Sequence, residues 1–315
     1  DTERILTTPR LDAQGSLYYE ADYDPFGNPS SRLFRADLAS GAASDSGQVG
    51  RTEPVFGYDV RQPQTKGSSH LVGDRGEDLL ARDASGVLWT YPAANGVGNL
   101  VGKRQRIGGG WLAYPAVVTG DFTSDDRTDL LAKDAAGGLW LYAGRPTGGM
   151  GARTKVGSGW ASYLLVSPGD WDGDGRADLL ARDASGALWL YPGTGRGTLG
   201  PRRQVGSGWN GMNVVLGAGD PDLDNRMDLV ARDIAGTLWL YPGRGDGGFL
   251  SRRRLGTGWQ GFTALAVKEV TDQTTYVWAR TRSGALYAYP IIGDGRFAGS
   301  YDTVGSGWNG YLITS

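Results

Sequence analysis

The stretch that decides the fold is "GDWDGDGRADLLARDASGALWLY", residues 169–191. It opens with four aspartates in nine positions, and two apolar runs, "DLLA" and "ALWLY", follow on either side of an Asp-Ala-Ser-Gly segment. Apolar residues at successive positions, without alternation, indicate short strands that are buried on both faces. The Asp- and Gly-rich segments are typical of tight turns. The stretch therefore predicts two short antiparallel strands behind an acidic loop.

The same pattern recurs with a period of about 50 residues, as expected of stacked repeats. Corners of the form Gly-x-Gly-Trp, such as "KVGSGW" and "QVGSGW", end in Trp111, Trp160, Trp209, Trp259 and Trp308. A second series, such as "GALWLYP", contributes Trp89, Trp140, Trp189 and Trp239, with Tyr287 in the fifth copy. Each unit reads as four short strands and needs no helix, so the repeats predict a β-propeller, in which four-stranded sheets stack face to face.

The number of blades is inferred from the two ends of the chain. "DAQGSLYY", residues 12–19, aligns with "DASGALWLY" and indicates an atypical first blade, and the final "WNGYLITS" aligns with "WNGMNVVL" and predicts a strand that completes it. We therefore expect one all-β domain over residues 1–315, a six-bladed propeller of four-stranded antiparallel blades, closed by the C-terminal strand joining the N-terminal blade. Seven blades remain open if the chain is a fragment. The expected blades are 1–52 with 311–315, 53–108, 111–157, 160–206, 209–256 and 259–305.

The acidic loop has the spacing of a calcium site. Positions 1, 3, 5 and 9 are Asp170, Asp172, Asp174 and Asp178, and position 6 is Gly175. Alternate carboxylates in a tight loop converge on one hard cation, for which Ca²⁺ is the natural occupant. Position 12 is Ala181 and a strand follows, so the loop is not an EF-hand. Without a cation, four carboxylates this close would repel one another.

Two further copies keep the acidic pattern. The next copy repeats it completely with Asp220, Asp222, Asp224 and Asp228, and an earlier copy has Asp121, Thr123, Asp125 and Asp129, one carboxylate fewer. We therefore expect two complete Ca²⁺ sites and a weaker third. Position 1 is His70 in one remaining copy and Lys268 in the other, so these are expected to bind no cation. We interpret the ions as structural, with a catalytic carboxylate pair as the less favoured alternative.

Acidic loops followed by "DLLARD" and "LWLYPG" resemble the FG-GAP/VCBS repeat family, which includes the propeller of integrin α chains and the Psathyrella velutina type of lectin. The resemblance covers about residues 54–315, although the Phe-Gly and Gly-Ala-Pro signatures of the name are not preserved. It implies a calcium-stabilised propeller, often extracellular, that binds glycans or proteins. In actinobacteria, similar repeats accompany secreted enzymes and lectin components of secreted toxin assemblies.

Composition excludes several classes of function. The net charge of −2 provides no bulk attraction for nucleic acid, and no apolar run is long enough to insert into a membrane. There is no cysteine, and the lone His70 argues against a Ser-His-Asp triad. The Asp-box of sialidases needs Asp five residues before its Trp, but that position is Ala184. Asp183 and Gly186 instead predict a hairpin turn, and we expect no enzymatic activity.

The Gly-Trp corners are the candidate ligand sites. Glycines let a ligand approach the backbone, an indole can stack on a sugar, and Asn210, Gln260 and Asn309 follow as hydrogen-bonding groups. The alternative is that each Trp is a wedge between blades. Basic residues of the last strand of each unit, Arg202 and Arg203 among them, are interpreted as protection of an exposed sheet edge.

The sequence therefore predicts a secreted, non-catalytic, lectin-like recognition domain for glycans or cell-surface glycoconjugates. Several equivalent weak sites would give avidity on a multivalent surface. The alternative is a protein-docking module that attaches an enzyme or toxin partner within a larger secreted complex. A glycan-cleaving enzyme is the least favoured reading, and neither nucleic acid nor a membrane is expected as a partner. The first residue, Asp1, suggests a mature or excised chain.

Overall fold

A computed structural model of the chain describes five short strands before residue 46, and then residues 78–92, 103–271 and 274–314. The chain divides into two compact units, residues 1–64 and 65–315. The first unit is one antiparallel sheet in which β1, β3, β4 and β5 lie in this order and β2 also pairs with β3. Its strands are β1 (Arg4–Ile5), β2 (Arg10–Leu11), β3 (Ser16–Asp22), β4 (Ser31–Asp37) and β5 (Ala42–Asp45).

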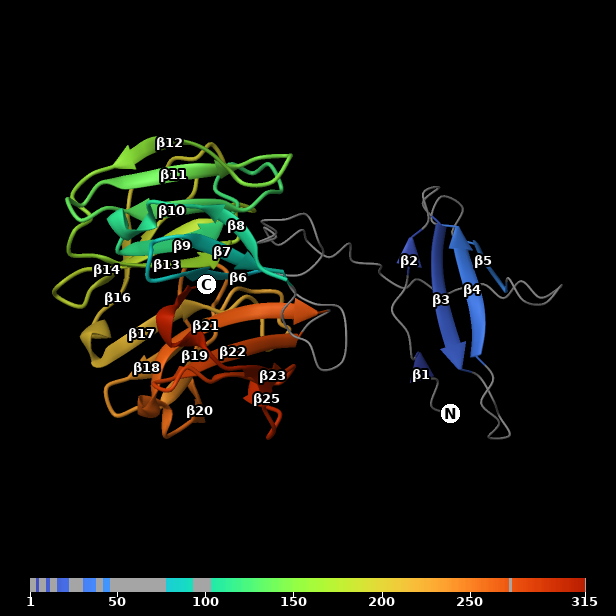
Figure 1. The fold of residues 1–315 in the computed structure, drawn as a ribbon. Helices are drawn as coiled ribbons and strands as arrows, with labels where there is room; N and C mark the ends of the chain where they lie inside the picture. The colour runs from blue at the N-terminus through green and yellow to red at the C-terminus, as the bar shows by residue number, and fades with distance from the viewer. Residues whose placement is uncertain are drawn as a thin grey trace. The chain divides into compact units, whose positions relative to one another are not determined.

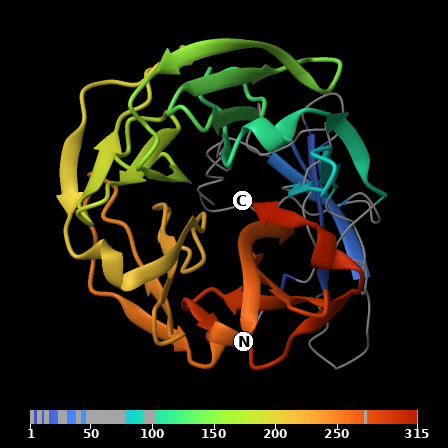
Figure 2. The same cartoon turned by 60° about the vertical axis from the view of Figure 1, so that its left-hand side comes forward.

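The described part of the second unit is a ring of five antiparallel blades (Figures 1 and 2). Blade I contains β6 (Leu79–Arg82), β7 (Leu88–Tyr91), β8 (Gln105–Gly108) and β26 (Leu312–Thr314). Blade II contains β9 (Ala116–Gly120), β10 (Asp129–Lys133), β11 (Leu139–Gly144) and β12 (Met150–Gly157). Blade III contains β13 (Leu164–Gly169), β14 (Asp178–Arg182), β15 (Leu188–Tyr191) and β16 (Arg203–Gly206). Blade IV contains β17 (Met212–Gly217), β18 (Leu229–Asp233), β19 (Leu238–Tyr241) and β20 (Arg253–Gly256). Blade V contains β21 (Phe262–Thr271), β22 (Thr274–Thr281), β23 (Leu286–Ile292), β24 (Arg296–Phe297) and β25 (Asp302–Gly305).

The expectation of six blades, closed by the C-terminal strand on the N-terminal blade, is wrong. β26 pairs with β6, with Leu312 opposite Arg82 and Ile313 opposite Ala81, so the tail completes blade I. Figure 2 shows this strand near the centre of the ring. The strand that follows each Gly-Trp corner is the inner strand of the next blade. The strand after the fifth corner, β26, therefore becomes the inner strand of blade I, beside β6. The strands of residues 4–45 form a sheet of their own.

The core lies between neighbouring blades, as the unalternated apolar runs predict. Leu131 and Leu139 of blade II pack in one cluster with Leu179 and Ala181 of blade III, and all four are at most 1% exposed. Equivalent clusters join the other neighbouring pairs round the ring. Because each second and third strand is covered on both faces, its side chains do not alternate between core and water.

An arginine or lysine near the end of the second strand of each blade hydrogen-bonds to the corner that leads into the next blade. The Nη1 atom of Arg82 donates to the Trp111 carbonyl at 2.8 Å, and that of Arg182 donates to the Trp209 carbonyl at 2.9 Å. Lys133, Arg232 and Arg280 bond to the following corner in the same way. Burial lowers the pKa of the Arg232 side chain. Four of the five corners are short 3₁₀ turns, η1 (Trp111–Ala113), η2 (Trp209–Gly211), η3 (Trp259–Gly261) and η4 (Trp308–Gly310), and the corner at Trp160 is a turn of another kind.

The Asp-x-x-Gly segments are hairpin turns, as predicted. Asp183 Oδ2 accepts a hydrogen bond from Trp189 Nε1 at 2.8 Å, and its Oδ1 accepts one from the Ala187 amide at 3.0 Å. Gly186 closes the turn at a φ of 86°, a conformation that L side chains rarely adopt. Hydrogen bonds from Ser185 and Trp189 lower the pKa of Asp183 to about 2. The same arrangement surrounds Asp83, Asp134 and Asp233.

Candidate metal and ligand sites

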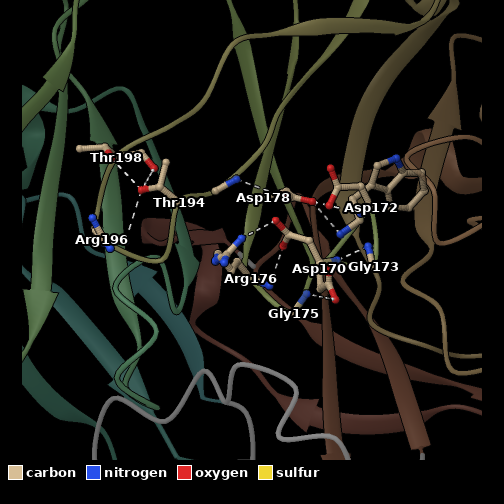
Figure 3. Close-up of polar contacts among 12 residues, drawn as sticks. Asp170, Asp172, Gly173, Gly175, Arg176, Asp178, Thr194, Arg196 and Thr198 are labelled. Carbon is tan, nitrogen blue, oxygen red and sulfur yellow. Dashed lines mark hydrogen bonds and ion pairs between the residues drawn. The ribbon is translucent and has the colours of Figure 1, made fainter.

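The three acidic loops connect the first and second strands of blades II, III and IV. We call them loop II (residues 121–129), loop III (170–178) and loop IV (220–228). Loop III folds round its first aspartate, because Asp170 accepts hydrogen bonds from the amides of Gly173 at 2.8 Å, Asp174 at 3.0 Å and Gly175 at 2.9 Å (Figure 3). Asn225 of loop IV has a φ of 64°, matching the left-handed glycine of loop III at position 6.

The ninth residue of each loop is a buried carboxylate. Asp178 Oδ2 accepts from the amides of Trp171 at 2.9 Å and Asp172 at 3.1 Å, and its Oδ1 accepts from the Gly193 amide at 2.8 Å. Burial raises the pKa of Asp178 to about 7. Burial also raises the pKa of Asp228 to about 8.

Carboxylate oxygens converge in two of the loops, within the residues that the structure describes. Oxygens of Asp170, Asp172 and Asp178, positions 1, 3 and 9 of loop III, lie within 4.8 Å of one another. In loop IV the oxygens that converge in this way are those of positions 1, 3 and 5, Asp220, Asp222 and Asp224. Loop II has Thr123 in place of the third-position carboxylate. The structure therefore brings together three of the four predicted ligands in each complete loop.

Unpaired buried oxygens show that these loops fit a cation. The third-position oxygens Asp172 Oδ1, Asp222 Oδ1 and Thr123 Oγ1 are buried and have no hydrogen-bond partner, and Asp228 Oδ2 is in the same state. A buried acceptor without a partner costs about 1–3 kcal/mol. An oxygen-only donor set with converging carboxylates is what Ca²⁺ prefers. The residues present thus fit the ion that the sequence predicts.

Several of the predicted ligands form ion pairs with arginines. Asp174 at position 5 of loop III pairs with Arg176 at 2.8 Å, and Asp125 of loop II pairs with Arg127. The position-3 carboxylate of loop III lies 3.5 Å from Arg203 Nη2. These guanidinium groups offset part of the negative charge of the loops. The spacing of the aspartates alone does not predict these arginine pairs.

Each acidic loop also meets a hairpin of the next blade. The Gly247 amide donates to the Trp171 carbonyl at 3.1 Å, and Arg203 Nη2 donates to the Asp246 carbonyl at 2.8 Å. Gly247 has a φ of 83°, a conformation that L side chains rarely adopt, so this position favours glycine. The loops therefore contribute to the joints between blades.

The five corner tryptophans lie in the gaps between blades. Trp111, Trp160, Trp209, Trp259 and Trp308 are 5–8% exposed. The Trp111 ring centroid is 4.9 Å from that of Tyr142, and the Trp160 ring centroid is 4.6 Å from that of Tyr191. Most of each indole face is thus covered by protein, which leaves the rims of the gaps for a ligand.

The residue after each corner tryptophan lies on the hairpin of the preceding blade. Asn210 Nδ2 donates to the Ala184 carbonyl at 3.1 Å, and Gln260 and Asn309 lie against the equivalent hairpin glycines. All three side chains are exposed.

The gap between blades I and II contains a cavity of about 410 Å³. It is lined by the corner Gly108, Gly109, Gly110 and Trp111 together with Ile107, Ala113, Tyr114, Tyr142, Met150, Gly151 and Arg153. The Tyr114 and Tyr142 hydroxyls are 2.6 Å apart, and Arg153 Nη1 donates to the Tyr114 hydroxyl at 2.7 Å. Aromatic, hydroxyl, glycine and guanidinium groups therefore meet in one hollow.

A second cavity, of about 230 Å³, lies among the inner strands β9, β13, β17 and β26. Its lining is mainly aliphatic, and none of the described residues that form it is a carboxylate.

The described part of the chain also has no helix long and apolar enough to cross a membrane.

Comparison with known families identifies the repeat. Residues 121–181 and 170–231 match the FG-GAP-like repeat. The matched residues, which contain the three acidic loops, thus carry FG-GAP-like repeats, and this confirms the resemblance drawn from those loops. A search of curated proteins found no match.

Solved lectin structures are similar to this chain at low identity. A lectin from Agrocybe aegerita, described as recognising non-reducing terminal N-acetylglucosamine, has a TM-score of 0.46 and 15% identity over 96% of this chain and 86% of its own. The BP39L lectin from Burkholderia pseudomallei has a TM-score of 0.45 and 17% identity over 95% and 82%. A variant of the Aleuria aurantia lectin in complex with α-methyl-L-fucoside has a TM-score of 0.42 and 13% identity over 90% and 94%. The ligand of this chain must therefore be argued from its own residues.

Proposed function

We propose that this chain is a secreted, non-catalytic recognition module, a lectin-like propeller that binds carbohydrate in the gaps between its blades. The observation that carries the proposal is the cavity between blades I and II, at a corner that the sequence nominates as a ligand site. Binding sites for small polar ligands are hollows with aromatic walls and a few placed hydrogen-bonding groups. The Tyr142 ring and the linked hydroxyls of Tyr114 and Tyr142 supply both.

A recognition role also agrees with the distribution of titratable groups. The described lining of the second cavity, among the inner strands, holds no carboxylate pair that could act as acid and base on a glycosidic bond. The clustered aspartates lie instead in loops that join blades. Ca²⁺ held there by loops III and IV would supply rigidity to those joints, with Asp170, Asp172, Asp178, Asp220, Asp222 and Asp224 as the carboxylate ligands.

The proposal is tested by a glycan array probed with the purified, folded chain in Ca²⁺-containing buffer. Reproducible binding to a related set of sugars is the expected result. The Tyr142→Ala variant should weaken that binding, whereas Tyr276→Ala, on the second strand of blade V, should not. A blank array with protein shown to be folded would refute the lectin assignment and favour the docking alternative, for which a pull-down of protein partners is the next measurement.

A further inference from the structure

In four blades an arginine in the outer strand, or directly before it, lies over the ring of a tryptophan of the neighbouring strand. The Cζ atom of Arg153 is 4.2 Å from the centroid of Trp140, and that of Arg202 is 4.1 Å from the centroid of Trp189. Arg104 and Arg252 stack in the same way at 4.1 and 4.0 Å. Stacking on an indole fixes the plane of a guanidinium and leaves its edge available for hydrogen bonds. These side chains are therefore held in place rather than spread into water.

In three gaps this arginine is tied to a pair of tyrosines beside the corner tryptophan. Arg153 bonds to Tyr114, whose hydroxyl touches that of Tyr142, and Arg202 bonds to Tyr163 at 2.6 Å and Tyr191 at 3.3 Å. The third gap, between blades V and I, repeats the arrangement with Arg104, Tyr311 and Tyr91. The complete sets are Trp111, Tyr114, Tyr142 and Arg153; Trp160, Tyr163, Tyr191 and Arg202; and Trp308, Tyr311, Tyr91 and Arg104.

The other two gaps lack the set and are filled by phenylalanine. Between blades III and IV, Arg252 still bonds to the Tyr241 hydroxyl at 3.0 Å, but Met212 takes the place of the first tyrosine. In this gap Phe249 packs on Trp209 with ring centroids 5.4 Å apart. Between blades IV and V, Phe297 stacks on Trp259 at 5.3 Å, and Tyr301 stands where the arginine would be. The gaps thus fall into three with an Arg–Tyr–Tyr group and two that are packed with aromatic rings.

The arginines of the complete gaps have unused donors and, among the residues that the structure describes, no ion-pair partner. A guanidinium has five N–H groups, and the hydrogen bonds of Arg104, Arg153 and Arg202 to tyrosine use only Nη1. None of the three forms an ion pair within the described residues. All three are exposed, and Arg153 lines the 410 Å³ cavity. An immobilised, unpaired guanidinium at the rim of an aromatic hollow is suited to bidentate binding of a carboxylate.

We infer that the three gaps with the Arg–Tyr–Tyr group bind sugars that bear a carboxylate, one per gap. The inference rests on the proposed function and gives its ligand a chemical class. The arginine edge pairs with the sugar carboxylate, and the tyrosine hydroxyls bond to sugar hydroxyls. The two phenylalanine-packed gaps bind no acidic sugar. The ring therefore carries three acidic-sugar sites and not five.

The test is calorimetric titration of the folded chain with two acid and ester pairs, trigalacturonate and 3′-sialyllactose, each beside its methyl ester, with lactose as a neutral sugar. We expect three sites per chain for the uronate, the sialoside or both. Each ester should bind at least about tenfold more weakly than its acid, because the ester lacks the charge that the arginine binds. The pair that binds identifies the source of the carboxylate. Binding of acid and ester alike, or of lactose alone, would overturn the acidic class while leaving the lectin proposal in place. Absence of binding to every sugar here and on the array would overturn both.

Variants separate the two kinds of gap. Arg153→Met, Arg202→Met and Arg104→Met should each remove about one site of three and leave the melting temperature within a few degrees. The matched control is Arg252→Met, which removes the same stacking in a phenylalanine-packed gap and should leave the number of sites unchanged. Equal loss from Arg252→Met and Arg153→Met would refute the assignment of the sites to the Arg–Tyr–Tyr gaps.

Discussion

Removal of Ca²⁺ should destabilise the propeller by an amount that the two complete loops set. Each of loops III and IV brings three carboxylates within 4.8 Å and leaves a buried third-position oxygen without a partner. A ligand at a concentration one hundred times its dissociation constant adds about 2.7 kcal/mol per site, so two sites add about 5 kcal/mol. A unit of this size shifts its melting temperature by about 2–4 °C per kcal/mol. Chelation should therefore lower the melting temperature by about 10–20 °C.

The assay is a thermal melt, followed by circular dichroism, with saturating Ca²⁺ and with excess EDTA. Asp172→Asn and Asp222→Asn should each lose about half of the increment due to Ca²⁺. In EDTA the same variants should stay within about 1 kcal/mol of the parent, because loss of the pair with a partly exposed arginine and relief of carboxylate repulsion oppose each other. Asp246→Asn, an exposed acid outside the loops, is the matched control and should keep the whole increment.

Two results would contradict this reasoning. A melt that is identical with Ca²⁺ and with EDTA would show that the loops hold no ion. A variant Asp172→Asn that is equally weakened in both buffers would show that this side chain supports the loop without binding a cation.

Other predictions concern the joints, the closure of the ring and the acidic loops. Arg182→Ala removes two hydrogen bonds from a charged donor to the next corner and should lower the free energy of unfolding, measured by chemical denaturation, by about 3–6 kcal/mol. An unchanged denaturation midpoint would refute the claim that Arg182 joins the two blades. Deleting residues 312–314 takes the inner strand from blade I and should lower the melting temperature of the whole ring, whereas deleting residues 1–45 should not; equal effects would contradict the closure. In EDTA, the raised pKa values of Asp178 and Asp228, about 7 and 8, mean that the folded state holds protons that the unfolded state releases above pH 4. Stability should therefore fall by about 1.4 kcal/mol per pH unit for each group, from about pH 4 to about pH 7 for Asp178 and to about pH 8 for Asp228. A flat profile would refute this.

The strands and their burial could be predicted because the repeat is present in the sequence five times. The blade count could not, because "DAQGSLYY" matches the third-strand pattern over a few residues only. A turn followed by Leu-Tyr-Tyr suits any exposed hairpin, and β3 indeed belongs to a sheet outside the ring. Which blade the strand at 312–314 joins depends on pairing between residues about 230 positions apart, and the local pattern carries no information about this.

The candidate sites also differ in how far the sequence predicts them, because some are local in the chain and others depend on distant residues. The acidic loops are local, so spacing alone predicts which oxygens converge. The role of Arg182 depends on carbonyls 27 and 30 residues further along the chain. A basic residue recurs near the end of the second strand of all five blades, followed by Asp in four of them, and this was a signal that could have revealed the role. Each Arg–Tyr–Tyr group combines a tyrosine at a Gly-Trp corner with a tyrosine and an arginine that lie far from it in the chain, for example 28 and 39 residues away. The arginines near the outer strands were therefore interpreted only as protection of an exposed edge.

Closure by β26 has a consequence for how a nascent chain folds. Blade I is translated before the other four, yet its inner position stays vacant until residues 312–314 emerge, and such long-range pairings form slowly. Until then β6 offers an open row of backbone donors and acceptors beside the apolar side chains of Leu79 and Leu80. An unfilled strand position of this kind invites the same segment of another molecule. At high concentration, refolding chains should therefore exchange tails and form linked dimers, while dilution should return closed monomers.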